Sequence, residues 1–501
     1  MMRRSPKRST AALRHVRMLH HPRTKIVATL GPASRDERTI LDLVRAGVDV
    51  FRLNAAHSDA KMLTRDIHAI RRVQRQLKVS IGILVDLQGP KIRVGPFLNA
   101  EPIWLKRGED LVISTKPDVV GQAAEAGQTT RIGTGYPRLA KDVRTGERVL
   151  LDDGIIELRV LRVEGTEIHT RVVYGGLLKQ FKGINLPGSK VSAESLSAKD
   201  LADLEVVLRA GVDFVALSFV READDVVRLK KRIAELGGDV QVIAKIERPE
   251  AVKNLTAILA AADAVMVARG DMGVELGAEA VPAIQKRIIR MSLDVCKPCI
   301  TATQMLESMI TNPRPTRAEA SDVANAIYDG TSAVMLSAET ASGKHPLRAV
   351  KIMQRIIRHT EDDMFSRWEY QRRRRLTTQV PASVAQSTVR AAAYAASESG
   401  ARYIVVYTES GATAQMLAAE RTPHRLVAFT PHQQTFQRLS LVWGIVPRRV
   451  SKARTSSEMT LEGARILQES GMGKKGDRIV VIFGASREKG MTNIMKIRTL
   501  E

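Results

Sequence analysis

The sequence is poor in cysteine, aromatic residues and long apolar runs, and each shortage excludes a class of protein. Two cysteines in 501 residues, Cys296 and Cys299, cannot form the disulfide framework of a secreted protein. No run of about 18 apolar residues appears, so no membrane partner is expected. Aromatic residues make up only 4% of the chain, which leaves few platforms for stacking nucleic-acid bases. We therefore expect a cytoplasmic protein that folds without disulfides.

Acidic residues are also in deficit, with 54 Asp and Glu against 78 Lys and Arg and a formal net charge of +24. Such a charge attracts phosphate-bearing ligands or nucleic acid without sequence preference. No helix-turn-helix, zinc-knuckle or RNA-recognition motif accompanies it, so no specific nucleic-acid partner is predicted. We interpret residues 1–22 as a basic extension in solvent, with a transit peptide as the alternative. Residues 361–382, which include the run Arg372–Arg375, are interpreted as a linker.

Short apolar runs alternate with amphipathic stretches over much of the chain. Such runs are typical of parallel strands that are buried on both faces. Eight strands in strand–helix alternation predict an α/β fold with a (β/α)8 barrel, formed by residues 23–91 and 191–360. The predicted strands are 24–30, 48–53, 81–87, 213–220, 241–247, 264–269, 299–303 and 332–337.

Two further regions have a different pattern. Residues 92–190 are rich in Gly and Val with short β-type runs, which predicts an inserted small β-barrel lid domain. Without this insertion, the flanking segments approach the length of about 250 residues that is typical of such barrels. Residues 383–501 alternate helices and strands again, which predicts a C-terminal α/β domain of regulatory type with a mostly parallel sheet.

Polar residues follow the predicted barrel strands where the active site of such a barrel lies. Lys245 and Glu247 are two apart on one strand and therefore point to one face. Glu247 and Asp271, from adjacent strands, can reach one hard cation such as Mg²⁺. Together with the cations Arg52 and Lys245, they indicate phosphoryl transfer. The polar strand ends are Arg52, Asn54, His57, Asp86, Lys245, Glu247, Arg269, Gly270, Asp271, Thr303 and Gln304.

Six segments of the chain resemble segments of the pyruvate kinase family, and they occur in the same order as in that family. The resemblance covers about residues 24–500 and implies the potassium-independent, bacterial type. It implies transfer of the phosphoryl group of phosphoenolpyruvate to ADP, giving pyruvate and ATP, in the last step of glycolysis. It also implies Mg²⁺ or Mn²⁺ as cofactor and a homotetramer. The segments are FRLNAAHS (51–58), DLQGPKIR (86–93), AKIERPE (244–250), VARGDMGVELG (267–277), TATQMLESM (301–309) and NPRPTRAEASDVANAIYDG (312–330).

Roles for single residues follow from the resemblance. It implies that Arg52 holds the phosphoryl group and that Lys245 stabilises the charge on the phosphoryl group and the enolate. It implies that the substrate carboxylate binds to Gly270, Asp271 and Thr303, with Thr303 also near the proton delivered to the enolate. Catalytic roles are implied for Arg52, Lys245 and Thr303, metal binding for Glu247 and Asp271, and nucleotide binding for Asn54, His57, Arg93 and Lys199.

One departure concerns potassium. The potassium-dependent members carry Ser, Thr and Glu where this sequence has Ala56, Leu87 and Lys91. Two oxygen ligands are thus absent, which leaves Asn54 and Asp86, and a lysine ammonium can replace the monovalent ion. We therefore expect no potassium requirement.

The loop Thr408, Ser410, Gly411 and Thr413 resembles the family's sugar-phosphate effector loop, and it is a candidate site for a sugar-phosphate or nucleotide. Glu409 and Ala412 stand where some members have basic residues, which leaves the ligand open. Two alternatives remain at this point. One is a basic nucleic-acid- or surface-binding protein on a barrel scaffold. The other is a carbon–carbon lyase that acts on a pyruvate-like enolate and would not need ADP.

Overall fold

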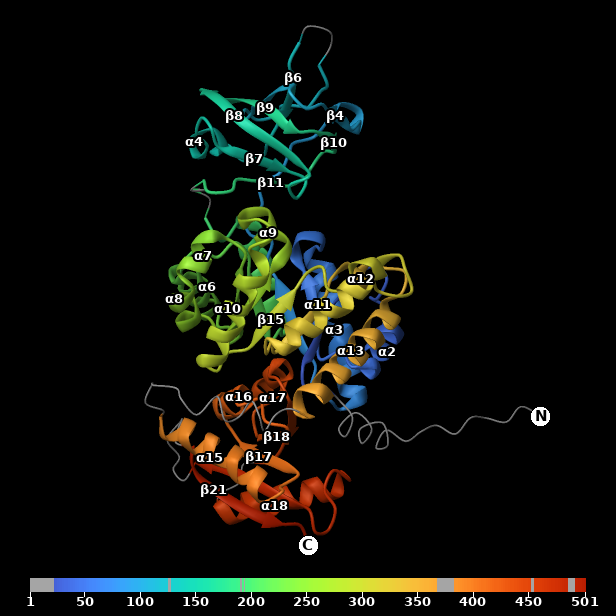
Figure 1. The fold of residues 1–501 in the computed structure, drawn as a ribbon, viewed down its shortest axis with the longest axis vertical. Coiled ribbons are helices and arrows are strands. Elements are labelled where there is room, and N and C mark those ends of the chain that lie inside the picture. The colour runs from blue at the N-terminus through green and yellow to red at the C-terminus, as the bar shows by residue number, and fades with distance from the viewer. Residues whose placement is uncertain are drawn as a thin grey trace, which may run out of the picture.

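The computed structural model describes residues 22–124, 128–189, 192, 194–366, 383–451, 455–484 and 492–501. Residues 1–21 of the predicted extension and residues 367–382 of the predicted linker lie outside the described residues, whereas residues 361–366 of that linker are the end of α13 (Pro346–Ser366). The chain forms three bodies, with the barrel in the middle, the inserted sheet domain at one end and the C-terminal domain at the other (Figure 1). None of the helices in these ranges is long and apolar enough to span a bilayer.

The central body is a closed barrel of eight parallel strands, as predicted, in the order β1-β16-β15-β14-β13-β12-β3-β2. Each strand overlaps one predicted run, and nearly all strand residues are buried, because the barrel interior covers one face and the helices the other. The strands are β1 (Lys25–Thr29), β2 (Val50–Asn54), β3 (Gly82–Asp86), β12 (Phe214–Leu217), β13 (Gln241–Ile246), β14 (Ala264–Ala268), β15 (Cys299–Ala302) and β16 (Ala333–Leu336).

Helices cover the outside of this barrel, and two of them end at corresponding glycines. Gly211 ends α5 in the left-handed conformation with a φ of 87°, whereas Gly47 ends α2 at a φ of 122°, beyond that region. The elements are α2 (Glu37–Ala46), η1 (Ala55–His57), α3 (Ala60–Leu77), α5 (Ala198–Ala210), α6 (Ala223–Glu235), α7 (Pro249–Lys253), α8 (Leu255–Ala261), α9 (Arg269–Leu276), α10 (Val281–Asp294), η3 (Glu307–Ile310), α11 (Arg317–Tyr328), α12 (Ala338–Ala341) and α13 (Pro346–Ser366).

The inserted domain has its own apolar core between a six-stranded sheet, ordered β11-β7-β8-β9-β5-β6, and a two-stranded β10-β4 sheet. The pairs are antiparallel except β5 and β6, whose connection is long enough for a parallel crossover. The elements are η2 (Leu98–Ala100), β4 (Ile103–Leu105), β5 (Asp110–Ser114), β6 (Thr130–Gly133), α4 (Leu139–Asp142), β7 (Arg148–Leu151), β8 (Ile156–Glu164), β9 (Glu167–Tyr174), β10 (Gly176–Leu178) and β11 (Ile184–Asn185).

The C-terminal domain has a five-stranded sheet, β19-β18-β17-β20-β21, in which only β21 is antiparallel. It closes the amino-terminal mouth of the barrel, because Leu441 packs with the apolar side chains of the barrel interior. The opposite mouth is left for the site. The elements are α15 (Val384–Glu398), β17 (Tyr403–Tyr407), α16 (Ala412–Ala419), β18 (Arg425–Thr430), α17 (Gln433–Arg438), η4 (Leu439–Leu441), β19 (Ile445–Arg449), α18 (Ser456–Glu469), β20 (Arg478–Gly484) and β21 (Thr492–Thr499).

Candidate active site

The carboxyl ends of the barrel strands bring together most of the predicted polar residues. Arg52, Asp86 and Lys245 each stand two positions beyond an apolar residue of the same strand. Because strand side chains alternate, the polar residues lie directly above the apolar layer that fills the barrel. That layer includes Val50, Leu84 and Ile243. The strand register therefore sets the height of the polar layer.

Arg52 is held in place by a buried carboxylate. Its Nε donates to Asp86 Oδ2 at 2.9 Å, its Nη2 lies 2.8 Å from the same oxygen, and its Nη1 donates to Thr29 Oγ1 at 3.1 Å. Burial alone would raise the pKa of Asp86, but Lys245 and Arg52 outweigh it and lower the pKa below its ordinary value. Asp86 thus stays ionised and fixes the guanidinium.

Lys245 is the central cation of the site. Its Nζ donates to Ser218 Oγ at 2.8 Å and lies 3.6 Å from Asp86 Oδ1 and 3.5 Å from Glu247 Oε2. Burial lowers the pKa of Lys245, but Asp86, Glu247 and Asp271 outweigh it and raise the pKa to about 12. The side chain therefore remains an ammonium ion at neutral pH.

Glu247 and Asp271 form the candidate metal pair. Glu247 is fully buried, its Oε1 accepts from the Phe219 N–H at 2.5 Å, and its Oε2 has no hydrogen-bond partner among the described residues. Burial raises the pKa of Glu247 to about 7, and Asp271 adds to this, whereas Lys245 opposes it. The side chain of Asp271, in the first turn of α9, makes no hydrogen bond or ion pair with a described residue. Two carboxylates with spare oxygens suit Mg²⁺, which keeps several waters and takes other ligands from substrate.

No cluster of three or more His, Cys, Asp or Glu side chains that could hold a metal occurs in the described part of the chain. A site shared between two carboxylates and the oxygens of a substrate is compatible with the arrangement.

Thr303 and Gly270 form a small cradle beside this pair. Thr303 Oγ1 accepts from the Gly270 N–H at 2.9 Å and donates to the Ala302 carbonyl at 2.7 Å. A Cβ at position 270 would lie 3.6 Å from Thr303 Oγ1, so glycine leaves this space open. Gly270 and Asp271 lie in the first turn of α9, whose amides have no acceptor within the helix; of these two amides, that of Gly270 already donates to Thr303 Oγ1.

Arg269 supports this cradle, although its role did not follow from the sequence. Thr303 and Gln304 adopt φ angles of 64° and 53°, which are unfavourable for residues with a Cβ. The Arg269 guanidinium donates to the Thr303 carbonyl at 2.6 Å and to the Gln304 carbonyl at 3.1 Å, and its Nη1 donates to Asp322 at 2.7 Å. An arginine that ends an apolar run, directly before the Gly-Asp pair, was the available signal.

The predicted nucleotide residues are only partly brought together. Asn54 Oδ1 accepts from the Ala56 N–H at 3.2 Å and so caps η1, which ends at His57. Burial lowers the pKa of His57, as do the nearby charges of Arg93, Arg52 and Lys91, and this favours the neutral imidazole. Arg93 donates to the Phe181 carbonyl of the inserted domain at 3.1 Å. Lys199 donates to the Ala55 carbonyl at 2.8 Å and pairs with Asp203.

The positions that differ from the potassium-dependent pattern supply no side-chain oxygen. Leu87 is buried in the apolar core around the barrel. The Lys91 side chain makes no hydrogen bond or ion pair with a described residue, and its Cε lies 3.2 Å from where a Cβ of Gly183 would stand. Lys91 thus stands at the junction with the inserted domain, close enough to act electrostatically on His57.

The candidate effector loop lies far from this site, between β17 and α16. Thr408 Oγ1 accepts from the Gly411 N–H at 2.9 Å, and Ser410 Oγ accepts from the Ala412 N–H at 3.4 Å. The hydroxyl groups of Thr413 and Thr492 are 2.6 Å apart. The loop therefore uses two of its own amides internally.

Comparison with known proteins gives a consistent result. The family models "Pyruvate kinase, barrel domain" and "Pyruvate kinase, alpha/beta domain" match residues 21–350 and 386–498. The chain is 43% identical to pyruvate kinases of Geobacillus stearothermophilus and Mycobacterium tuberculosis, covering 95% of this chain and 80% and 98% of theirs. A crystal structure of a pyruvate kinase from Cryptosporidium parvum matches with a TM-score of 0.89 and 31% identity, covering 96% of both chains. The chain therefore belongs to the pyruvate kinase family of phosphotransferases.

Proposed function

We propose that this protein transfers the phosphoryl group of phosphoenolpyruvate to ADP, giving pyruvate and ATP, with Mg²⁺ and without a need for potassium. The observation that carries the proposal is the position of Lys245, whose ammonium lies within 3.6 Å of two buried carboxylates at the carboxyl end of the barrel. With Arg52 beside it, the site concentrates fixed positive charge next to a pair of carboxylates suited to a metal.

Fixed positive charge is what phosphoryl transfer requires from the protein. In the loose transition state, negative charge spreads over the oxygens of the moving group. Arg52 would hold that group, and Lys245 would stabilise it together with the enolate that is left behind. Because Asp86 and Ser218 already fix both cations, little reorganisation is needed during the reaction.

Glu247 and Asp271 would hold Mg²⁺, although Mn²⁺ has the same preference for oxygen ligands. When bound, the ion neutralises charge on the phosphoryl oxygens. The proton on Glu247 must leave before the carboxylate can act as a ligand, and the Lys245 charge favours that loss.

Substrate orientation and protonation would depend on the cradle. The amides of Gly270 and Asp271 and the Thr303 hydroxyl would bind the carboxylate of phosphoenolpyruvate. Phosphoryl loss leaves an enolate that must gain a proton at its terminal carbon. Thr303 would lie near that carbon, and its hydroxyl could take part in proton delivery.

ADP would bind between the barrel and the inserted domain, with Asn54, His57, Arg93 and Lys199 on the nucleotide side. The inserted domain, residues 92–190, would act as a lid that excludes water. We place the catalytic barrel at 23–91 and 191–360, the linker at 361–382 and the C-terminal domain at 383–501. We further propose a cytoplasmic homotetramer, with the loop that contains Thr408, Ser410, Gly411 and Thr413 as an effector site.

The proposal that potassium is not required rests on the side chains that could bind a monovalent ion. Asn54 and Asp86 would be its side-chain ligands, but Asn54 already caps η1 and Asp86 already binds Arg52 and Lys245. The Lys91 ammonium would supply positive charge near this place instead.

A product assay tests the proposed function against its alternatives. We expect pyruvate to form from phosphoenolpyruvate only when ADP and Mg²⁺ are both present. Pyruvate and inorganic phosphate formed from phosphoenolpyruvate without ADP would indicate hydrolysis instead of transfer. Pyruvate released without ADP from a longer 2-oxo acid, by cleavage of a carbon–carbon bond, would favour a lyase. A salt-sensitive shift of nucleic acid in a gel, with no turnover of phosphoenolpyruvate, would favour the nucleic-acid-binding alternative.

A further inference from the structure

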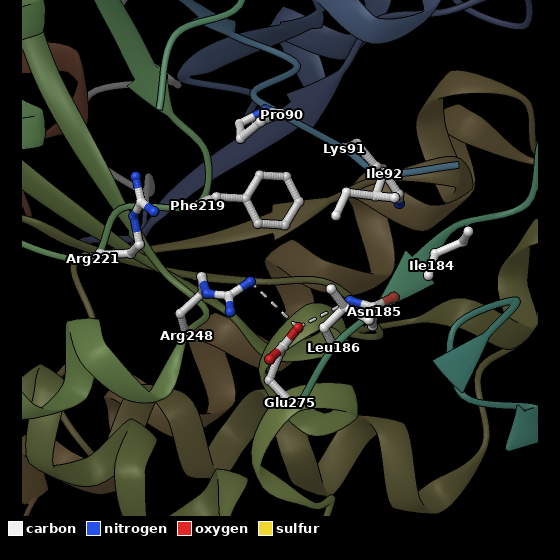
Figure 2. Close-up of a pocket in the computed structure, with 10 residues that line it drawn as sticks. All are labelled: Pro90, Lys91, Ile92, Ile184, Asn185, Leu186, Phe219, Arg221, Arg248 and Glu275. Carbon is white, nitrogen blue, oxygen red and sulfur yellow. Dashed lines mark hydrogen bonds and ion pairs between the residues drawn. The ribbon is translucent and has the colours of Figure 1, made fainter. Parts of the chain in front are cut away.

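Glu275 lies where the inserted domain meets the barrel, at the far end of α9 from Asp271. Its side chain is buried, with 8% of the residue exposed. Its Oε1 accepts from Asn185 Nδ2 at 3.3 Å and lies 3.6 Å from Arg248 Nη1. Figure 2 shows the Arg248 and Asn185 side chains directed at the Glu275 carboxylate from opposite sides. Glu275 therefore connects three separate segments of the chain.

Each of these segments matters to the site. Asn185 belongs to β11, and it lies opposite Leu150 of the neighbouring strand β7. Asn185 is therefore part of the sheet of the inserted domain. Arg248 follows Glu247 directly in the sequence. Helix α9 carries Asp271 in its first turn and Glu275 in its last. Through these contacts, a displacement of the inserted domain would reach the segments that hold both candidate metal carboxylates.

A hollow beside Glu275 leaves room for such a displacement. About 490 Å³ of space lies between its lining residues, and this volume includes open solvent. Glu275 Oε2 is buried and has no hydrogen-bond partner among the described residues, so the carboxylate keeps a spare acceptor. Phe219, whose N–H binds Glu247, also lines the hollow. Asn185, Arg248 and Glu275 all line this hollow (Figure 2).

A purely stabilising ion pair explains this arrangement poorly. A buried carboxylate loses much of its hydration, and one well-placed cation does not always offset that loss. Burial raises the pKa of Glu275 in spite of the opposing charge of Arg248, which indicates incomplete compensation. Arg248 also lies 3.4 Å from Glu250 and so has a second carboxylate partner.

We propose that Glu275 is a positioning residue that couples the placement of the inserted domain to the two candidate metal carboxylates, through Asn185 on one side and α9 and Arg248 on the other. This inference rests on the proposed function, because it assigns the coupling to phosphoryl transfer. Glu275 itself touches no reacting atom.

Hydrogen exchange tests the coupling without any measurement of activity. Asn185→Ala changes only the inserted domain, yet the amides at the end of α9 should exchange about tenfold faster, the effect of losing one hydrogen bond to a charged group. In the full-length protein, Glu275→Ala serves as the reciprocal variant and should speed exchange around Asn185. The matched controls are the exposed residues Thr166, as Thr166→Ala, and Glu279, as Glu279→Ala. Unchanged exchange at α9 in folded Asn185→Ala protein would overturn the coupling.

Steady-state kinetics then test whether the coupling through Glu275 affects catalysis. Asn185→Ala and Glu275→Ala should each lower kcat by about tenfold while the KM for phosphoenolpyruvate changes less than about threefold. Because both act through one contact, the double variant should be no worse than the poorer single variant. Glu275→Gln keeps an oxygen for Asn185 and should retain more activity than Glu275→Ala. Independent losses that multiply to about a hundredfold would contradict the proposal.

The two experiments separate this inference from the proposed function. A wild-type protein that does not convert phosphoenolpyruvate and ADP would refute the proposed function, while the exchange data would still decide the coupling. Active wild type with unaltered kcat in Asn185→Ala and Glu275→Ala would refute the positioning role alone.

Discussion

Arg269 holds the backbone of Thr303 in a left-handed conformation, because its guanidinium donates to the Thr303 carbonyl at 2.6 Å while the φ of Thr303 is 64°. A β-branched residue rarely adopts such a φ, and its cost is of the order of 1–3 kcal/mol. The conformation places Thr303 Oγ1 at the Gly270 N–H. Asp322 on α11 anchors the guanidinium in turn. The backbone of Thr303 is thus held in an unfavourable conformation, and this conformation sets the position of the candidate catalytic hydroxyl.

We expect Arg269→Lys to lower kcat by roughly tenfold or more, because a single ammonium cannot make the set of planar contacts that the guanidinium makes. Asp322→Asn should have a smaller effect in the same direction. Steady-state kinetics with a circular-dichroism check of folding provide the measurement. Wild-type kcat in folded Arg269→Lys protein would show that Thr303 keeps its position without this support.

Lys245→Ala and Asp271→Ala should each lower turnover roughly 100- to 1000-fold, the effect of removing a preorganised charge from an active site. The folded state should persist, since Lys245 lies at the carboxyl end of β13 and Asp271 in the first turn of α9, at the mouth of the barrel and outside its apolar core. Lys253→Ala and Asp294→Ala, at exposed positions, are the matched controls and should behave as wild type. Turnover near the wild-type rate in either active-site variant would remove the basis of the site assignment.

We expect no potassium requirement. Rates in sodium, potassium and tetramethylammonium buffers should agree within about twofold at one ionic strength. The ionic strength must be matched, because the rates of a protein of net charge +24 with anionic substrates respond to screening alone. Lys91→Glu should lower turnover, because it replaces a positive charge near the site by a negative one. A tenfold stimulation of the wild type by potassium would contradict the proposed role of Lys91.

Cys299 should resist thiol reagents in the folded protein. Burial raises its pKa from 9.0 to about 12, so almost no thiolate forms at pH 8. Above pH 9 the unfolded chain loses this proton while the folded chain keeps it, so Cys299 lowers stability as pH rises from 9 to 12. At pH 8, a colorimetric thiol reagent should label Cys299 only after denaturant is added. Fast labelling of the folded Cys296→Ser variant would contradict the buried placement.

Much of the architecture could be predicted because its signals are local. The barrel strands are continuous apolar runs, and both faces of such a strand are buried, so each run marks a strand with little ambiguity. The inserted domain was recognisable by its change of pattern at residue 92. The parallel pairing of β5 with β6 was not, because strand partners depend on contacts distant in sequence.

The candidate site was predictable where a strand fixes the direction of a side chain. Lys245 and Glu247 share a face because they are two residues apart, and the 3.5 Å between their charged atoms follows from this. The support of Thr303 by Arg269 could not be predicted, since it depends on backbone torsion angles at the end of another strand. The contact between Asn185 and Glu275 likewise requires the placement of the inserted domain on the barrel.

The most direct test of the proposed reaction follows phosphorus by ³¹P nuclear magnetic resonance in a mixture of phosphoenolpyruvate, ADP, Mg²⁺ and the full-length protein. We predict that the phosphoenolpyruvate signal falls as the γ-phosphate signal of ATP rises one for one, and that Lys245→Ala nearly abolishes both changes. Two results would contradict phosphoryl transfer at this site. One is the appearance of inorganic phosphate in place of ATP, and the other is conversion of phosphoenolpyruvate to ATP by Lys245→Ala at the wild-type rate.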